Sequence, residues 1–232
     1  MNKFNFPDWV PQVEQNSKIL VIGASGGIGK ALVKLLLKGP KCVIGFHRSS
    51  SVITNDSTDL EHDIIDLKHT LTCDKECHNL VDIFTKKANG IDCLVVLCGG
   101  IRNPNHWKNI NEKDWNEDIN LNLSIPFFLA RSAMEKMKTG GQIVLIGTES
   151  AIHGGSPTSL AYGVAKRGIE CLVQGLARDG SKNNILVNGI RLGFIKSGFH
   201  ERWQGKSKRE IQERINLIPL GRGGEPEEAA AF

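Results

Sequence analysis

The sequence contains a single tyrosine, Tyr162, and a lysine, Lys166, follows it four residues later. On a helix this spacing places both side chains on one face, one turn apart. An ammonium group beside a phenol stabilises the phenolate, so it lowers the tyrosine pKa from about 10 toward neutral pH. A tyrosine with such a pKa can give or take a proton during a reaction. The same spacing is common on helix surfaces, so its meaning depends on the rest of the chain.

Short apolar runs alternate with helical patterns along the chain, which is typical of a parallel sheet with helices on both faces. We therefore predict a three-layer α/β domain over residues 18–232, preceded by an N-terminal arm at residues 1–17. The expected strands are Lys18–Ile22, Cys42–Phe46, a third ending near Asp63, Asp92–Leu97, Ile143–Ile146 and Leu186–Ile190. The expected helices are Ile28–Leu37, Leu80–Ala88, Trp115–Met137, Tyr162–Arg178 and Ile211–Leu217.

The composition is that of an ordinary globular protein. At 232 residues, with 40% hydrophobic and 23% charged residues, the chain is long enough for one domain with a sizeable core. Its net charge of +4 is small and spread out, which does not favour nucleic-acid binding. No stretch approaches the roughly 20 apolar residues of a membrane span. Six scattered cysteines without a zinc-type spacing favour a reduced, cytoplasmic compartment and no metal site.

A glycine-rich turn, Gly23-Ala24-Ser25-Gly26-Gly27-Ile28-Gly29, directly follows the first predicted strand and opens the first predicted helix. Glycines allow a tight turn and a close approach of the backbone to a pyrophosphate, and the helix N-terminus offers free N–H groups to that anion. Strand, turn and helix together indicate a dinucleotide site and a doubly wound, Rossmann-type sheet.

Together, the glycine turn with its G-x3-G-x-G spacing and the Tyr-x3-Lys pair resemble the short-chain dehydrogenase/reductase family. The resemblance runs from about Lys18 to Ala231. It includes the D-h-x-D, N-N-A-G-I, W-x3-I-x2-N-L, V-N-x-I-x-P-G-x-I-x-T and I-P-L-G-R-x-G-E-P-E-E segments of that family. Their counterparts here are Asp63–Asp66, Leu97–Ile101, Trp115–Phe127, Val187–Ser197 and Ile218–Glu228. The last segment is similar to that of 3-oxoacyl-thioester reductases.

The resemblance implies a nicotinamide cofactor. The residues expected to bind it are those that match the cofactor-binding positions of the family. The residue after the second strand decides between the two cofactors, because an acid there would repel the 2′-phosphate of NADP(H). Here Arg48 follows, with Ser49 and Ser50, and we predict that they bind this phosphate, so NADP(H) is favoured over NAD(H). Asp63 is expected to bind the adenine amino group. The expected cofactor-binding residues are Gly23, Ser25, Gly27, Ile28, Gly29, Arg48, Asp63, Gly99, Tyr162, Lys166, Ile195 and Ser197.

The resemblance also implies the catalytic roles. Tyr162 is expected to donate a proton to the substrate oxygen in reduction and to remove it in oxidation. Lys166 is expected to lower the tyrosine pKa and to hold the nicotinamide ribose. Asn122 is expected to hold a water molecule through a main-chain distortion in its helix.

The fourth catalytic group of the family is a serine hydroxyl 13 residues before the tyrosine, and this chain has Glu149 there. Aligning the strand end instead makes Thr148 the hydroxyl, with one extra residue in the following loop. A threonine hydroxyl can donate the same hydrogen bond to a carbonyl. We predict Thr148, with Ser150 as the alternative.

Three other segments depart from the family pattern or carry its variable parts. Cys98-Gly99 stands in place of the usual Asn-Ala, and Leu192 replaces a proline. The segment Phe199–Leu217 lies where the family has a substrate lid, but a surface helix would explain it equally well. The family also has a further strand, and with it a dimeric or tetrameric assembly, after the helix in which this sequence ends at Phe232.

We therefore predict a single-domain oxidoreductase that interconverts a carbonyl and an alcohol. One alternative is a member that keeps the nucleotide but has lost turnover, which Glu149 and Cys98-Gly99 would favour. Another is a sugar-nucleotide epimerase or dehydratase, but these enzymes carry an extra substrate domain and a G-x2-G-x2-G turn. The substrate itself has no readable signature in the sequence.

Overall fold

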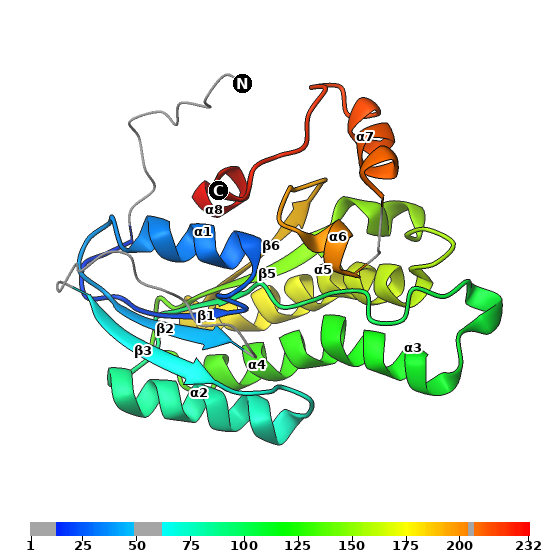
Figure 1. Cartoon of the computed structure of the whole chain (residues 1–232). Coiled ribbons are helices and arrows are strands. Elements are labelled where there is room, and N and C mark those ends of the chain that lie inside the picture. Colours follow the sequence, from blue (N-terminus) through cyan, green and yellow to red (C-terminus); the bar gives the residue numbers. More distant parts are fainter. Residues whose placement is uncertain (1–12, 49–61, 204–206) are drawn as a thin grey trace.

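The computed structural model describes residues 13–48, 62–203 and 207–232 (Figure 1). Six strands form one parallel sheet in the order β3-β2-β1-β4-β5-β6. This order and the flanking helices make the predicted Rossmann-type doubly wound fold. The strands are β1 (Lys18–Ile22), β2 (Val43–Arg48), β3 (Asp63–Lys68), β4 (Cys93–Val96), β5 (Gln142–Thr148) and β6 (Leu186–Leu192).

Strand β1 shows why the sheet is covered on both faces. Its side chains alternate, and four of its five residues are fully buried. Ile19 and Val21 join a core cluster on the side of α1 (Gly27–Leu36), which is shared with Ile44 of β2. Leu20 and Ile22 join the larger cluster on the opposite face. Four consecutive apolar residues, Ile19 to Ile22, buried on both faces are the pattern expected for the centre of a parallel sheet.

The helices form the two outer layers (Figure 1). On one face α1 packs against α8 (Pro226–Ala231). On the other face α2 (Asp74–Ala88), α4 (Ile125–Met134) and α5 (Leu160–Gly180) cover the sheet, and α3 (Glu112–Ile119) packs against α5. The short helices α6 (Phe199–Trp203) and α7 (Lys208–Asn216) follow β6. None of the helices in the described residues is long and apolar enough to cross a membrane.

Two predicted elements differ from the structure. The third strand was expected to end near Asp63, but β3 begins at that residue. The long helix predicted over Trp115–Met137 is present as a continuous run from Glu112 to Met134, with a π-helical segment at Asn120–Ser124 between α3 and α4. Pro126 is near the start of α4, directly after the π-helical segment. The irregularity in the predicted helix is therefore a local change of helical hydrogen bonding, and the helix does not break there.

The strand order reverses between β1 and β4, which are neighbours in the sheet although β2 and β3 intervene in the sequence. In open α/β sheets, ligands bind at the carboxyl ends of the strands beside such a reversal, because the loops on either side diverge and leave a crevice. The candidate site is therefore expected at the end of the sheet that carries Ile22 and Val96.

Candidate active site

The glycine turn connects β1 to α1 at this reversal point. The N-cap of α1 is Gly26, which makes no side-chain capping bond, and the first turn of α1 contains no acidic residue. The first N–H groups of a helix have no partner within the helix, and the helix dipole makes them favourable for an anion. The start of α1 therefore has what a pyrophosphate requires, which is unengaged donors without a competing carboxylate.

Two glycines of this turn have no room for a side chain. A Cβ on Gly29 would lie 2.3 Å from the carbonyl oxygen of Gly23. A Cβ on Gly27 would lie 2.5 Å from the carbonyl oxygen of Ser197, in the loop after β6. The two predicted cofactor segments, the glycine turn and the loop that carries Ser197, are thus brought into direct backbone contact.

The contact at Gly27 gives a testable prediction. Gly27→Ala is expected to force the Ser197 loop away from the turn, because the clash involves backbone that cannot rotate aside. We expect the affinity for both nicotinamide cofactors to fall by more than about tenfold, which corresponds to about 1.4 kcal/mol. Isothermal titration calorimetry with NADPH and NADH measures the loss.

Gly175→Ala is the matched control. Gly175 lies on α5 and is exposed, and a Cβ at this position would have no other heavy atom within 4 Å. Alanine is a better helix former than glycine by about 0.5–1 kcal/mol, so this variant should be slightly stabilised and bind normally. Normal cofactor binding by Gly27→Ala would show that the Ser197 loop yields without cost.

The end of β2 holds two residues that contact neighbouring segments. The buried His47 accepts a hydrogen bond at Nδ1 from the Gly23 N–H (3.4 Å) and its Nε2 lies 3.1 Å from the His69 carbonyl oxygen. Burial lowers the His47 pKa to about 4, so the ring is neutral and Nε2 carries the proton. His47 therefore links the glycine turn to the segment after β3. Nothing in the sequence marked this role.

Arg48, the last residue of β2, forms a two-pronged ion pair with Asp66 of β3. Its Nε donates to Asp66 Oδ1 at 2.8 Å, and its Nη2 donates to Oδ2 at 2.5 Å. The pair lowers the pKa of Asp66, so its carboxyl group is ionised at neutral pH. The predicted partners Ser49 and Ser50 lie outside the described residues.

The structure does not bring Asp63 to the site. Asp63 pairs with Val43, and Val43 pairs with Lys18, so it lies at the amino ends of the strands. The glycine turn lies at the carboxyl ends, beyond Ile22. The expectation that Asp63 binds adenine is therefore corrected, because β3 starts where it was predicted to end. The acid of this segment that lies toward the glycine turn is Asp66.

Asn122 lies within the π-helical segment, so the predicted main-chain distortion is present. Its side chain is fully buried, with Oδ1 accepting from Gly100 N–H at 3.0 Å and Nδ2 donating to Gly100 and Asp118 carbonyl oxygens at 2.8 Å each. A Cβ on Gly99 would meet Asn122 Oδ1 at 2.9 Å and Lys166 Nζ at 3.0 Å. These two polar groups therefore flank Gly99, and a larger residue there would displace both.

Tyr162 and Lys166 lie on α5 as predicted, and both are buried. The electrostatic relation between them differs from the expectation. Burial raises the pKa of Tyr162 to about 12, and hydrogen bonding by Thr148 only partly opposes this. Burial lowers the pKa of Lys166 to about 8, and its Nζ donates to the Ile146 carbonyl oxygen at 2.9 Å. Loss of hydration outweighs the attraction that the spacing suggested, so Tyr162 is a neutral proton donor at neutral pH.

The hydroxyl group that contacts Tyr162 is that of Thr148, the last residue of β5. The hydroxyl of Ser150, the alternative, is within hydrogen-bonding distance of Thr148, with its Oγ 3.2 Å from Thr148 Oγ1. Glu149 forms an ion pair with Arg191 of β6, with 3.0 Å between Oε2 and Nε. This pair accounts for the unexpected acid, because it engages the carboxylate with β6 while Thr148 contacts the tyrosine.

The segment after β6 contacts two other parts of the chain, the turn at Gly224 and the helix that carries Tyr162. Ile195 forms a parallel bridge with Gly224, and the Lys196 N–H donates to the Gly224 carbonyl at 2.9 Å. Farther along, the ring of Phe199 on α6 packs against Tyr162, with 5.8 Å between centroids. The predicted lid segment thus begins in contact with the predicted catalytic tyrosine.

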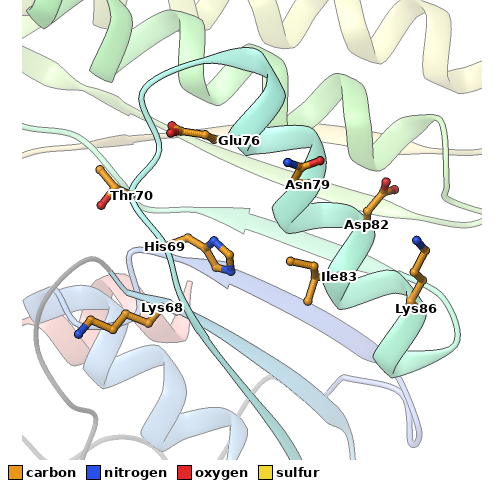
Figure 2. A pocket seen from close by; sticks show the side chains of 8 residues that line it. All are labelled: Lys68, His69, Thr70, Glu76, Asn79, Asp82, Ile83 and Lys86. Carbon is orange, nitrogen blue, oxygen red and sulfur yellow. The ribbon is translucent and has the colours of Figure 1, made fainter.

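A hollow of about 510 Å³ lies elsewhere, between the end of β3 and α2. Figure 2 shows that the lining side chains come from α2, among them Glu76, Asn79 and Asp82, and from the segment that carries His69. Its acidic groups are already engaged: Asp82 pairs with Lys136, and Glu76 accepts from Thr72. The hollow contains none of the predicted site residues, and we assign it no role.

Comparison with known proteins agrees with this geometry. The family described as short chain dehydrogenase matches residues 17–208. A 3-oxoacyl-[acyl-carrier-protein] reductase FabG from Rickettsia typhi is 32% identical over 214 residues, which cover 91% of this chain and 85% of that protein. The FabG of Chlamydia pneumoniae is 31% identical over 221 residues, covering 92% and 86%.

Solved structures agree in fold. A short-chain dehydrogenase/reductase from Serratia marcescens superposes with a TM-score of 0.83 at 22% identity, covering 94% of this chain and 89% of that one. A dehydrogenase from Burkholderia cenocepacia with bound NADP has a TM-score of 0.80 at 17% identity, covering 93% and 84%.

Proposed function

This chain belongs to the short-chain dehydrogenase family and is an oxidoreductase of carbonyl and alcohol groups, and we propose that it is an NADP(H)-dependent reductase with Tyr162 as the proton donor. The observation that carries the proposal is the arrangement of Tyr162. It is buried and neutral, the nearby Thr148 hydroxyl partly offsets the rise in its pKa, and it lies on the same helix as Lys166.

Tyr162 would give its phenolic proton to the substrate oxygen. When bound, the nicotinamide supplies or accepts the hydride at the substrate carbon. Thr148 would donate a hydrogen bond to the same oxygen, since its hydroxyl already lies against the phenol. A phenol with a raised pKa is a weak acid, so the proton leaves it only as negative charge develops on the substrate oxygen.

Lys166 and Asn122 would support the tyrosine after it has lost its proton. The pKa of Lys166, near 8, is close to neutral pH, so its amine can both take up and release a proton there. Its Nζ flanks Gly99 together with Asn122 Oδ1, so Lys166 and the π-helical segment lie on either side of the same glycine. We propose that Lys166 also holds the nicotinamide ribose.

The cofactor would lie across the reversal point of the sheet. The glycine-turn residues would hold the pyrophosphate at the start of α1, which has no cap and no acid in its first turn. Gly99, Ile195 and Ser197 would contact the nicotinamide half. Arg48 would bind the 2′-phosphate of NADP(H), and a basic residue at the end of β2 favours that cofactor over NAD(H). The residues proposed for the pyrophosphate are Gly23, Ser25, Gly27, Ile28 and Gly29.

For the substrate, we propose a 3-oxoacyl thioester, the class named for the relatives from Rickettsia typhi and Chlamydia pneumoniae. The lid segment is consistent with an apolar acyl chain, because Phe199 presents an aromatic ring beside Tyr162. A cytoplasmic location and a homo-oligomer remain predictions. Glu149 pairs with Arg191, so this departure from the family pattern is compatible with turnover, and a non-catalytic nucleotide-binding role is the alternative.

The cofactor proposal is tested by titrating NADPH and NADH separately into the wild type and Arg48→Leu. We expect Arg48→Leu to weaken NADPH binding by about 10–100-fold, which corresponds to one lost charged hydrogen-bond pair of about 1.5–3 kcal/mol. NADH binding should change less than about twofold.

Arg131→Leu is the control, because Arg131 also forms an ion pair with an aspartate, Asp74, away from the site. It should bind both cofactors normally. Equal loss of NADPH and NADH binding by Arg48→Leu would contradict its assignment to the phosphate.

A further inference from the structure

The ion pair at the end of β2 carries an inference that rests on the proposed function and deepens it. We propose that Asp66 is a selectivity-determining residue, which opposes the 2′-phosphate that Arg48 attracts and favours an unphosphorylated ribose. The chain would then accept both nicotinamide cofactors, with a preference for NADPH that Asp66 keeps small.

Asp66 is placed for this role by the register of the sheet. It pairs with Phe46 on β2, two residues before Arg48, and its side chain reaches forward to the guanidinium. Ile22, which precedes the glycine turn, pairs with His47, the neighbour of Arg48. The pair of charges therefore lies on the second and third strands at the carboxyl edge, close to the turn that is proposed to hold the pyrophosphate.

The two partners differ in burial. The Arg48 side chain is 12% exposed, whereas the Asp66 side chain is 53% exposed. The arginine is therefore held against the protein, and the carboxylate remains open to solvent on its outer side. A ligand that reaches Arg48 must come close to this carboxylate.

Arg48 can hold a second anion without releasing Asp66. A guanidinium has five N–H donors in a planar fork, and the two bonds to Asp66 use only Nε and Nη2. The remaining donors can bind a phosphate. The phosphate would then share Arg48 with a carboxylate that is ionised throughout the neutral range, because the ion pair lowers the Asp66 pKa.

Because Asp66 shares Arg48 with the ligand, binding of a 2′-phosphate is weakened, whereas binding of an unphosphorylated ribose is not. Asp66 repels the negative charge of a 2′-phosphate, so it subtracts from the attraction of Arg48. The hydroxyl groups of an unphosphorylated ribose are donors, and a carboxylate is the strong acceptor for them. Asp66 therefore acts in opposite directions on the two cofactors.

The test compares two ligands that differ only in the phosphate, adenosine 2′,5′-bisphosphate and adenosine 5′-monophosphate, by calorimetric titration. The affinity ratio between them cancels any contact of Asp66 with adenine. Asp66→Asn removes the charge and keeps an oxygen that can accept from Arg48 Nε. We expect it to raise this ratio by about five- to tenfold, and to raise the ratio of NADPH to NADH affinity in the same direction.

Two controls isolate the effect. Asp82→Asn removes another ion-paired aspartate, whose partner is Lys136, and should leave both ratios unchanged. Arg48→Leu should lower the ratio, in the direction opposite to Asp66→Asn. Asp66→Ser provides a second neutral variant should the asparagine perturb folding, which a melting curve would reveal.

The outcomes separate this inference from the proposed function. A ratio that stays within twofold of the wild type, or that falls, in both neutral variants overturns the role of Asp66 while leaving the enzyme assignment intact. Failure of the wild type to bind any of the four ligands overturns the proposed function and this inference with it.

Discussion

Replacing Tyr162 with phenylalanine is expected to lower the turnover number by about 10²–10⁴-fold, the range that a single positioned acid contributes. The change removes one hydroxyl group from a buried ring and leaves the ring's packing against Phe199 in place. The substrate oxygen then has no proton donor, although Thr148 can still hydrogen-bond to it. Steady-state reduction of a 3-oxoacyl thioester with NADPH measures the loss.

Cofactor affinity is the internal control for this variant. A contact through the Tyr162 hydroxyl contributes at most about one hydrogen bond, so NADPH affinity should fall by less than about tenfold. Loss of turnover with binding kept identifies chemistry as the step that fails. Retained turnover would mean that another group donates the proton, and the proposed role of Tyr162 would be wrong.

Tyr162 also offers a direct spectroscopic reading, because it is the only tyrosine in the chain. The ultraviolet absorbance of tyrosinate therefore reports its pKa without interference from other tyrosines. We expect deprotonation well above pH 10, since burial raises the pKa to about 12. A midpoint below about 9 in the absence of cofactor would contradict the neutral-donor state, because it lies under the ordinary tyrosine value of about 10.

Replacing Lys166 with methionine is expected to abolish most activity and yet to stabilise the fold. The depression of the Lys166 pKa from 10.5 to about 8 corresponds to a penalty of about 3 kcal/mol for keeping this buried amine charged at pH 7. Methionine carries no charge and has a similar volume. Allowing about 1 kcal/mol for the lost bond to Ile146, we expect a gain of about 2 kcal/mol at pH 7, measured by urea unfolding.

The pH dependence identifies the cause. The pKa of Lys166 is lower in the folded protein than in the unfolded chain. Its neutral form therefore costs no stability above the unfolded pKa, and the protein loses free energy of unfolding as the pH falls from there through the folded pKa. The wild type should therefore lose stability relative to Lys166→Met as pH falls from about 10.5 to 8. The raised pKa of Tyr162 weakens both proteins equally as pH rises from 10 to about 12, so it cancels in the difference.

The exposed Lys182, which pairs with Asp179, is the control for removing a lysine. Lys182→Met should show no gain in stability at any pH. A Lys166→Met protein that is less stable than the wild type at pH 7 would show that the buried amine is not under this strain.

The layered fold and most of the site could be predicted from local patterns. The buried strand before the glycine turn and the helix after it depend on neighbouring residues, and so does the one-turn spacing of Tyr162 and Lys166. These features can be predicted without knowing the tertiary contacts, because side chains alternate along a strand and repeat with a fixed period along a helix.

The differences between prediction and structure arise from features that depend on distant contacts or on burial. Strand β3, with the sequence DIIDLK, follows a polar stretch and has no clear alternation, so its pattern does not show where it begins or which of its two acids lies toward the site. The pairing of Arg48 with Asp66 joins two strands and leaves no signal in either one. The pKa values of Tyr162 and Lys166 depend on hydration lost in the folded protein, which a spacing of four residues does not reveal.

The most direct test of the central claim is to mix the wild type with NADPH and a short 3-oxoacyl thioester and to follow the nicotinamide absorbance together with the product by mass spectrometry. We expect NADPH to be consumed and the 3-hydroxyacyl thioester to appear in equal amount, with almost none from Tyr162→Phe. A protein that binds NADPH tightly but consumes none with this substrate or with a panel of simple ketones would contradict it, and would instead support a nucleotide-binding role without turnover.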